Sequence, residues 1–237
     1  MLKTSTLFIL LIAFVNSIHA QTFSYPQINK TGKSIHDFVP AGWTILQSVK
    51  GDLNKDGLPD VVLVLQHIDT VQLITVKDDD KDTVTTKPRL LAIVFKNERT
   101  TGYSLAQQSN TFILTNEQKY MDDPLEPIII KTGILNIKFN VAYSMGSWYT
   151  DINNYKFRFQ NNEFKLIGAD SYSLHRASHD FTKYSFNFST HKRILTIGNE
   201  DKGRKKVHYK TFPNTKLQSL TTFTAPFTWE VEPDIFL

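Results

Sequence analysis

Residues 51–65 read Gly-Asp-Leu-Asn-Lys-Asp-Gly-Leu-Pro-Asp-Val-Val-Leu-Val-Leu. From Asp52 to Asp60 the pattern is D-x-N-x-D-G-x-x-D, in which oxygen-bearing side chains at alternate positions converge on one centre. Gly57 permits the sharp turn that closes such a loop around a hard cation. The apolar run that follows is typical of a strand. The stretch therefore predicts a calcium loop that leads directly into a β-strand.

Hydrophobic residues elsewhere mostly recur at every second position, which indicates strands rather than helices. The clearest hairpin surrounds Asn161-Asn162, a pair that adopts the positive φ angles of a tight turn. Three hairpins are expected, over residues 128–139, 155–168 and 182–197. Helix signals are weak, and one brief helix is expected near residues 34–38 or 117–122. We expect a mainly β fold with antiparallel, sandwich-like sheets.

Residues 43–106 resemble one FG-GAP/VCBS-type repeat. The resemblance rests on the loop Asp52–Asp60 with its strand, on a second strand Leu90–Phe95 ending at Lys96-Asn97, and on Gly102-Tyr103. Such repeats form blades of β-propellers, which need about four to eight blades. The sequence contains no second copy of the loop. The resemblance therefore implies one blade-like calcium-loop hairpin and not a closed propeller.

The whole chain also resembles an uncharacterised group of secreted bacterial proteins that carry one such loop. This second resemblance rests on Val39–Trp43, Asp123–Glu126, and Phe164–Gly168 followed by Asp170-Ser171. It implies secretion and brings no activity with it.

By analogy with other calcium loops, the expected ligands are the side chains of Asp52, Asn54 and Asp56, the backbone carbonyl of Leu58 and the closing carboxylate of Asp60. The loop is not an EF-hand, because Leu63 stands where that motif needs a bidentate Glu and a strand follows where it needs a helix. The alternative is a metal-free turn rich in Asx hydrogen bonds. Mutual repulsion among three nearby carboxylates favours the metal.

Residues 1–20 have the features of a cleaved secretory signal peptide. Lys3 supplies the positive start, residues 7–15 form an apolar run too short for a membrane helix, and Ala20 precedes the expected cleavage point. A non-cleaved anchor is the alternative. The chain has no cysteine, which excludes a lipid-anchored cysteine and stabilising disulfides. We expect a secreted or periplasmic protein without a later membrane span, in which a bound metal serves in place of disulfides.

Two regions are expected after the signal: a calcium-loop β region at 21–120 and an antiparallel β region at 121–237, packed together as one unit. The acidic stretch Lys77–Asp82 lacks the composition of a flexible linker and predicts a long hairpin loop. Whether Asp78 to Asp82 bind a second ion stays open.

The net charge of +4, from 27 basic and 23 acidic residues, is too small and too mixed for a nucleic-acid footprint. The basic run Lys202–Lys210 is interpreted as a solvated loop with an edge strand. His175 and His179 have the spacing of a zinc pair on a helix, but their surroundings favour two surface histidines. The matches of residues 189–192 to S-x-x-K and of residues 131–133 to K-T-G are attributed to chance.

The sequence favours a secreted calcium-binding β protein with a binding or structural role toward an unknown protein or glycan partner. The alternative is a hydrolase of carbohydrate or envelope polymer that uses Asp122, Asp123 or Glu126, with Trp148 and Tyr149 as a sugar platform. Against it, prolines at 124 and 127 favour a plain loop with solvated carboxylates. A third hypothesis is protein recognition through an exposed sheet edge.

Overall fold

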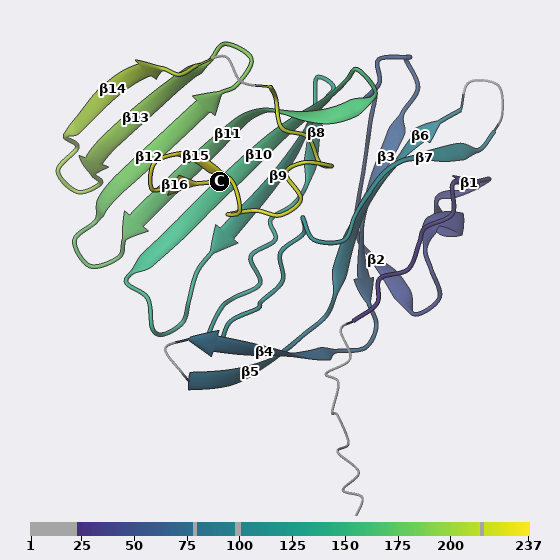
Figure 1. The fold of residues 1–237 in the computed structure, drawn as a ribbon, viewed down its shortest axis with the longest axis horizontal. Coiled ribbons are helices and arrows are strands. Elements are labelled where there is room, and N and C mark those ends of the chain that lie inside the picture. Colours follow the sequence, from purple (N-terminus) through teal and green to yellow (C-terminus); the bar gives the residue numbers. More distant parts are fainter. Residues whose placement is uncertain (1–22, 78–79, 98–100, 214–215) are drawn as a thin grey trace, which may run out of the picture.

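The computed structural model describes residues 23–77, 80–97, 101–213 and 216–237. The predicted signal peptide lies outside this part of the chain. The fold is mainly β, with 54% strand and 2% helix. All paired strands run antiparallel, and the described residues form two large sheets and two small ones (Figure 1). They form no closed barrel or propeller, which confirms the predicted fold class.

The first large sheet has five strands in the order β1-β7-β6-β3-β2. The strands are β1 (Thr31–Gly32), β2 (Trp43–Gly51), β3 (Asp60–His67), β6 (Arg89–Lys96) and β7 (Tyr103–Ser109). The two central strands are buried on both faces, at Val61–Leu65 of β3 and Leu90–Val94 of β6. Burial on both faces explains why their sequences are unbroken apolar runs rather than alternating ones.

A separate hairpin interrupts this sheet between β3 and β6. It consists of β4 (Val71–Lys77) and β5 (Asp80–Thr86), which pair only with each other among the described strands. The predicted hairpin is present, but the prediction of a long loop over Lys77–Asp82 is wrong, because strand pairing continues to Lys77 and resumes at Asp80. Asp78 and the side chains of residues 79–82 lie outside the described residues, so the second ion site stays a prediction.

The second large sheet is a seven-stranded meander in the order β14-β13-β12-β11-β10-β9-β8. Its strands are β8 (Ile129–Lys131), β9 (Ile134–Val141), β10 (Tyr149–Gln160), β11 (Glu163–His175), β12 (Asp180–Asn187), β13 (Lys192–Asn199) and β14 (Lys205–Thr211). The three predicted hairpins are confirmed as β8–β9, β10–β11 and β12–β13. Asn161 and Asn162 have φ angles of 52° and 60°, as the tight turn requires. The basic run forms the exposed edge strand β14.

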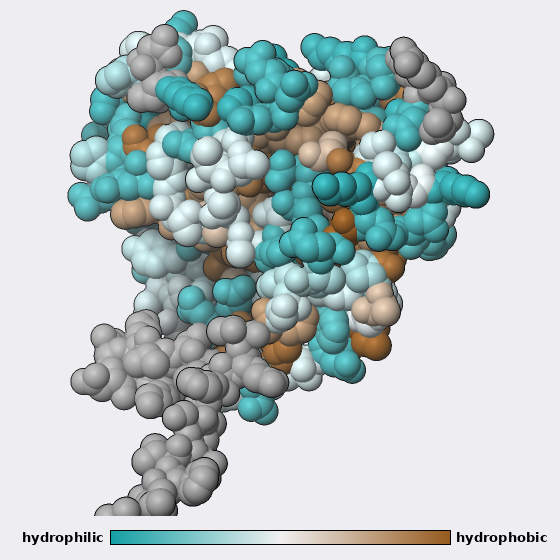
Figure 2. All heavy atoms as spheres, turned by 45° about the vertical axis from the view of Figure 1, so that its right-hand side comes forward, coloured by the Kyte–Doolittle hydropathy of each residue, from teal (hydrophilic) through white to brown (hydrophobic). Residues whose placement is uncertain are grey.

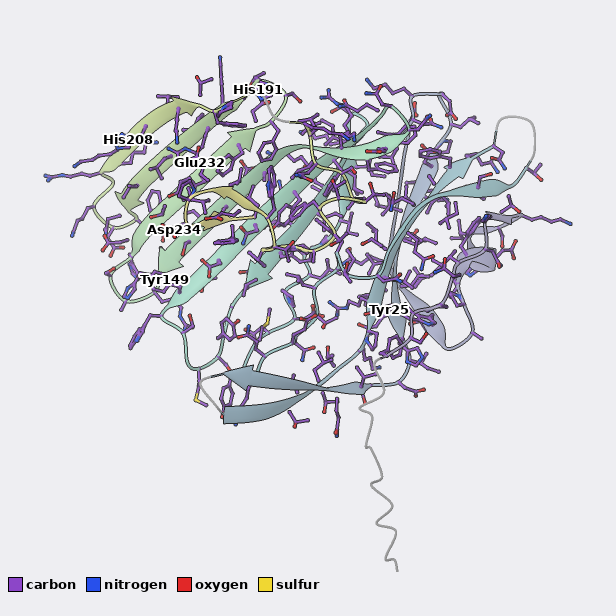
Figure 3. The ribbon with its side chains drawn as sticks, viewed as in Figure 1. Tyr25, Tyr149, His191, His208, Glu232 and Asp234 are labelled. Atoms are coloured by element: carbon purple, nitrogen blue, oxygen red, sulfur yellow. The ribbon has the colours of Figure 1, made fainter. Side chains whose placement is uncertain are left out.

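The C-terminal hairpin, β15 (Glu230–Glu232) and β16 (Ile235–Phe236), lies over the seven-stranded sheet (Figure 3). Glu232 attaches it to that sheet by accepting hydrogen bonds from Arg193 Nη1 on β13 (2.7 Å) and Lys210 Nζ on β14 (3.1 Å). Trp229 and Leu237 exchange backbone hydrogen bonds across the hairpin. The chain end is therefore held in place, and Leu237 is fully buried.

The two large sheets share one hydrophobic core. Val62, Val64, Leu91 and Ile93 of the five-stranded sheet belong to the same buried cluster as the inward residues of the seven-stranded sheet. The other face of the five-stranded sheet packs on an N-terminal segment that includes a 3-10 helix, Ile35–Phe38. That helix confirms the first of the two predicted positions, whereas residues 117–122 contain no helix.

The surface is largely hydrophilic, with scattered apolar residues, in the view of Figure 2. Within the described residues, no helix has the length and hydrophobicity needed to cross a bilayer.

Candidate calcium-binding loop

The predicted calcium loop connects β2 to β3, so its ends are fixed by the pairing of Gly51 with Asp60. The loop lies against the turn between β8 and β9 of the other large sheet. A side chain at Gly133 in that turn would have its Cβ only 3.3 Å from the carbonyl oxygen of Asp52. The loop therefore lies where the two large sheets meet, and its conformation bears on how they pack.

Hydrogen bonds within the loop hold its first half in a compact turn. Asp52 accepts from the backbone N–H of Lys55 (2.6 Å) and of Gly57 (3.0 Å). Asn54 Oδ1 accepts from the N–H of Asp56 (3.0 Å). Lys55 and Gly57 have positive φ angles of 67° and 86°, the region that glycine occupies without strain. The role predicted for Gly57 in the turn is confirmed.

Asp60 has the most constrained carboxylate in the loop. Its side chain is fully buried. Oδ2 accepts from the N–H groups of Leu53 (2.9 Å) and Asn54 (3.3 Å), and Oδ1 accepts from the N–H of Lys96 on β6 (3.0 Å). Burial raises the pKa of Asp60 above its usual value, although these hydrogen bonds act in the opposite direction. One carboxylate therefore joins the loop to two strands of the sheet.

The donor set fits a hard cation in its chemistry. Three carboxylates and one amide lie within the nine residues of the motif, and Asp52, Asp56 and Asp60 form no ion pair with a basic side chain of the described chain. Oxygen ligands of this kind are those that calcium prefers. An ion here would compensate charge that the protein itself leaves uncompensated.

The side-chain oxygens of the loop do not all point to one centre in this structure. As it stands, no three His, Cys, Asp or Glu residues in the described part of the chain lie close enough together to hold a metal. Asn54 Nδ2 donates to Asp56 Oδ2 (2.8 Å) and Asp56 Oδ1 accepts from the N–H of Leu58 (2.8 Å). Each carboxylate oxygen has two lone pairs, so it can accept one N–H and still ligate an ion. Metal binding therefore requires the loop side chains to turn toward a common point, not the loss of all these hydrogen bonds.

The acidic residues of the hydrolase alternative are placed in a loop that leads toward β8. Asp123 forms a two-point ion pair with Arg89 of β6, whose Nη1 lies 2.7 Å from Asp123 Oδ1. These hydrogen bonds from Arg89 lower the pKa of Asp123 below its usual value. Asp122 and Glu126 use their backbone N–H groups to bond the carbonyls of Ala142 and Lys138. A carboxylate with a lowered pKa is a poor proton donor at neutral pH, so Asp123 does not suit general acid catalysis.

We expect the Asp123→Asn variant to be about 1 kcal/mol less stable than the wild-type protein at pH 7, because it leaves the buried Arg89 without its anion. A carboxyl group whose pKa is lower in the folded state stabilises the protein above its unfolded pKa, and that stability disappears as the pH falls through the folded pKa. The difference in stability between the two proteins should therefore begin to shrink below the ordinary aspartate pKa and disappear as the pH falls through the lower folded pKa. Urea unfolding of both proteins at pH 7 and pH 2.5 measures this difference. An unchanged difference at pH 2.5 would contradict a stabilising ion pair between Asp123 and Arg89.

His175 and His179 are not on a helix, so their four-residue spacing does not place both imidazoles on one helix face as the zinc hypothesis requires. His175 ends β11, where its Nδ1 accepts from the N–H of Ser178 (3.1 Å). His179 lies in the following turn with a φ angle of 57°, and its Nδ1 is 2.7 Å from Asp201 Oδ2. That contact raises the pKa of His179. Trp148 is 67% exposed and stacks on the ring of His175.

Sequence reasoning missed a cavity of about 560 Å³ on the inner face of the seven-stranded sheet. Asp151 and Asn153 of β10 line it, together with Tyr143, Phe227 and Phe236. The alternation that predicts this hairpin is clear only from residue 155 onward, whereas β10 begins at Tyr149. Extending the same alternation backwards would have placed Asp151 and Asn153 on the inner face, where polar residues are unusual.

No family model matches the sequence, and no curated protein or solved structure is detectably similar to it.

Proposed function

We propose that this chain is a secreted or periplasmic β protein that binds calcium through the loop Asp52–Asp60 and has a binding or structural role. Asp52, Asn54 and Asp56 would supply side-chain oxygens, Leu58 its carbonyl and Asp60 the closing carboxylate. The proposed location rests on the signal-like features of residues 1–20. The partner is proposed to be a protein or a glycan.

The observation that carries the proposal is the buried carboxylate of Asp60. It has no cationic partner in the described structure, yet it fixes the position of Leu53, which is fully buried in the core that both large sheets share. A calcium ion would neutralise the loop and hold this arrangement. Its binding free energy then adds to the free energy of unfolding, because the unfolded chain has no preformed site.

The Asp56→Asn variant provides the direct test of calcium binding. Asparagine keeps a side-chain oxygen for the N–H of Leu58 but removes one of the negative charges of the loop. We expect calcium affinity, measured by isothermal titration calorimetry, to fall at least about tenfold, because affinity in such loops follows the number of charged ligands. Stability in EDTA should fall by only about 1 kcal/mol, because the half-buried side chain exchanges the oxygen that accepts from Asn54 Nδ2 for an amide nitrogen.

Asp69→Asn is the matched control, since it removes the same charge from an exposed turn between β3 and β4. It should bind calcium as the wild type does. Equal calcium affinity of Asp56→Asn and wild type, or no calcium binding by the wild type at millimolar concentration, would refute the proposed site.

A further inference from the structure

The cavity on the seven-stranded sheet is built from three parts of the chain. Strands β9, β10 and β11 contribute Val141, Asp151, Asn153 and Ser171. The segment after β7 lines a second side with residues between 114 and 121, and the C-terminal segment lines a third side with Pro226, Phe227 and Phe236. A volume of about 560 Å³ falls within the range of small-molecule sites.

The inner face of the sheet changes from apolar to polar at this cavity. Tyr155 and Phe157 of β10 are fully buried in the shared core, whereas the next inward positions toward the start of the strand are Asn153 and Asp151. Asn153 lies opposite Ser171 of β11. Successive inward positions would ordinarily continue the apolar core. Polar residues there depart from the pattern that the fold alone requires, and such departures are expected at functional sites.

Asn153 has an unsatisfied acceptor inside the protein. Only 2% of the residue is exposed, and its Oδ1 has no hydrogen-bond partner among the described residues. A buried polar atom without a partner destabilises a folded protein. The oxygen is shielded from solvent, so a donor in the cavity reaches it only when the Asn153 side chain turns toward the cavity. A ligand that carries an N–H or O–H group would then supply the missing donor.

The charge of the cavity lining further limits the class of ligand that would bind. Glu117 and Asp151 are the ionisable acids of the lining, and it contains no lysine, arginine or histidine. Asp151 forms no ion pair with a described residue, and its charge adds to the effect of burial in raising the pKa of Tyr143. Aromatic rings of Tyr143, Phe227 and Phe236 surround the same space. Carboxylates beside aromatic faces attract cations and repel anions.

We propose that this cavity binds a small organic cation, namely a protonated primary or secondary amine attached to an apolar body. Asp151 pairs with the ammonium group, and the aromatic and aliphatic lining packs against the apolar body. The Asn153 side chain turns on binding, so that its Oδ1 accepts one of the N–H groups of the ligand. A quaternary ammonium ion has no N–H to donate and should bind less well. No residue of the loop Asp52–Asp60 lines the cavity, so this site is independent of calcium.

Matched phenyl compounds test the class of ligand. We would titrate ¹⁵N-labelled full-length mature protein with 2-phenylethylamine, its N,N,N-trimethyl derivative, 2-phenylethanol and phenylacetate, and follow the amide spectrum. The amine should bind and shift the side-chain NH₂ signals of Asn153. The alcohol and the trimethyl compound should bind at least about tenfold more weakly, as expected for loss of a charge-assisted hydrogen bond. Phenylacetate should not bind.

Two variants separate recognition from folding. Asp151→Asn should weaken amine binding about tenfold or more, while Asp69→Asn, the same change on an exposed turn, should leave it unchanged. Asn153→Leu removes the unpaired buried oxygen, so it should abolish specific amine binding and raise the melting temperature by about 2–4 °C. A gain in stability together with lost binding is expected of a site that is built for a ligand.

Three binding results would overturn the proposal. They are amine binding that Asp151→Asn leaves unaltered, equal binding of the alcohol or phenylacetate, and no binding of the amine at 10 mM. A fall in melting temperature on Asn153→Leu would also overturn it, because it would show that the asparagine stabilises the free protein.

Discussion

The Asp60→Ala variant should lose about 3–5 kcal/mol of unfolding free energy even in EDTA. The substitution leaves the N–H groups of Leu53, Asn54 and Lys96 without their acceptor; the first bond is buried and the other two are partly buried. An unsatisfied donor that is shielded from water costs about 1–3 kcal/mol. Relief of the buried negative charge offsets part of this cost. Because Leu53 is released from the core at the same time, the loss should be measurable by urea unfolding as a lower midpoint. The variant should also lose any response to calcium.

The controls for Asp60 use the same chemistry in other places. Asp69→Ala removes an exposed carboxylate and should change stability by no more than about 0.5 kcal/mol. Asp60→Asn keeps one acceptor oxygen and should fall between wild type and Asp60→Ala. A cost below about 1 kcal/mol for Asp60→Ala would show that the loop does not depend on this carboxylate.

The Phe112→Ala variant should be destabilised by about 3–5 kcal/mol, the range for deleting a fully buried aromatic side chain. Phe112 follows β7, and its ring centroid lies 5.4 Å from that of Tyr155, 5.2 Å from Phe157 and 5.5 Å from Phe223. These rings come from the seven-stranded sheet and the C-terminal segment, and all belong to the cluster that also includes β3 and β6. One residue therefore connects the three parts.

Because the core is shared, Phe112→Ala should shift one cooperative transition rather than create a second. Far-UV circular dichroism and tryptophan fluorescence should report the same lower urea midpoint, as two-state unfolding requires. Phe236→Ala, at a residue that is 51% exposed, is the control and should cost much less. Two separated transitions, with one probe unaffected, would contradict the single core.

Local sequence signals were sufficient for the hairpins but not for their assembly. Alternation and Asn161-Asn162 specify β10–β11 because the information lies within a few residues of the turn. Nothing local indicates that β4 and β5 leave the first sheet, or that Glu232 attaches the C-terminal hairpin to β13 and β14. These features depend on contacts between residues far apart in the chain, such as Glu232 and Arg193.

The candidate sites likewise combine features that local sequence predicts with features that depend on distant residues. The spacing of the loop from Asp52 was sufficient to predict a closed turn, since a glycine and Asx residues act on their own backbone. The burial of Asp60 against Lys96 was not predictable, because Lys96 comes from a strand beyond an inserted hairpin. Asp123 gave no local sign of its ion pair with Arg89, and Asn153 could not be assigned to a face until the start of β10 was known.

A thermal melt of residues 21–237 in EDTA and across a calcium titration tests the central claim most directly. Extracellular calcium modules bind at about 10⁻⁴ to 10⁻³ M, and saturation at about 100 times the dissociation constant adds about 2.7 kcal/mol. At 10 mM calcium, which is about 10 to 100 times these dissociation constants, we predict a saturable rise in melting temperature of about 3–10 °C, with magnesium giving little. Identical melting temperatures in EDTA and calcium would contradict the account and leave the loop an ordinary turn held by its own hydrogen bonds.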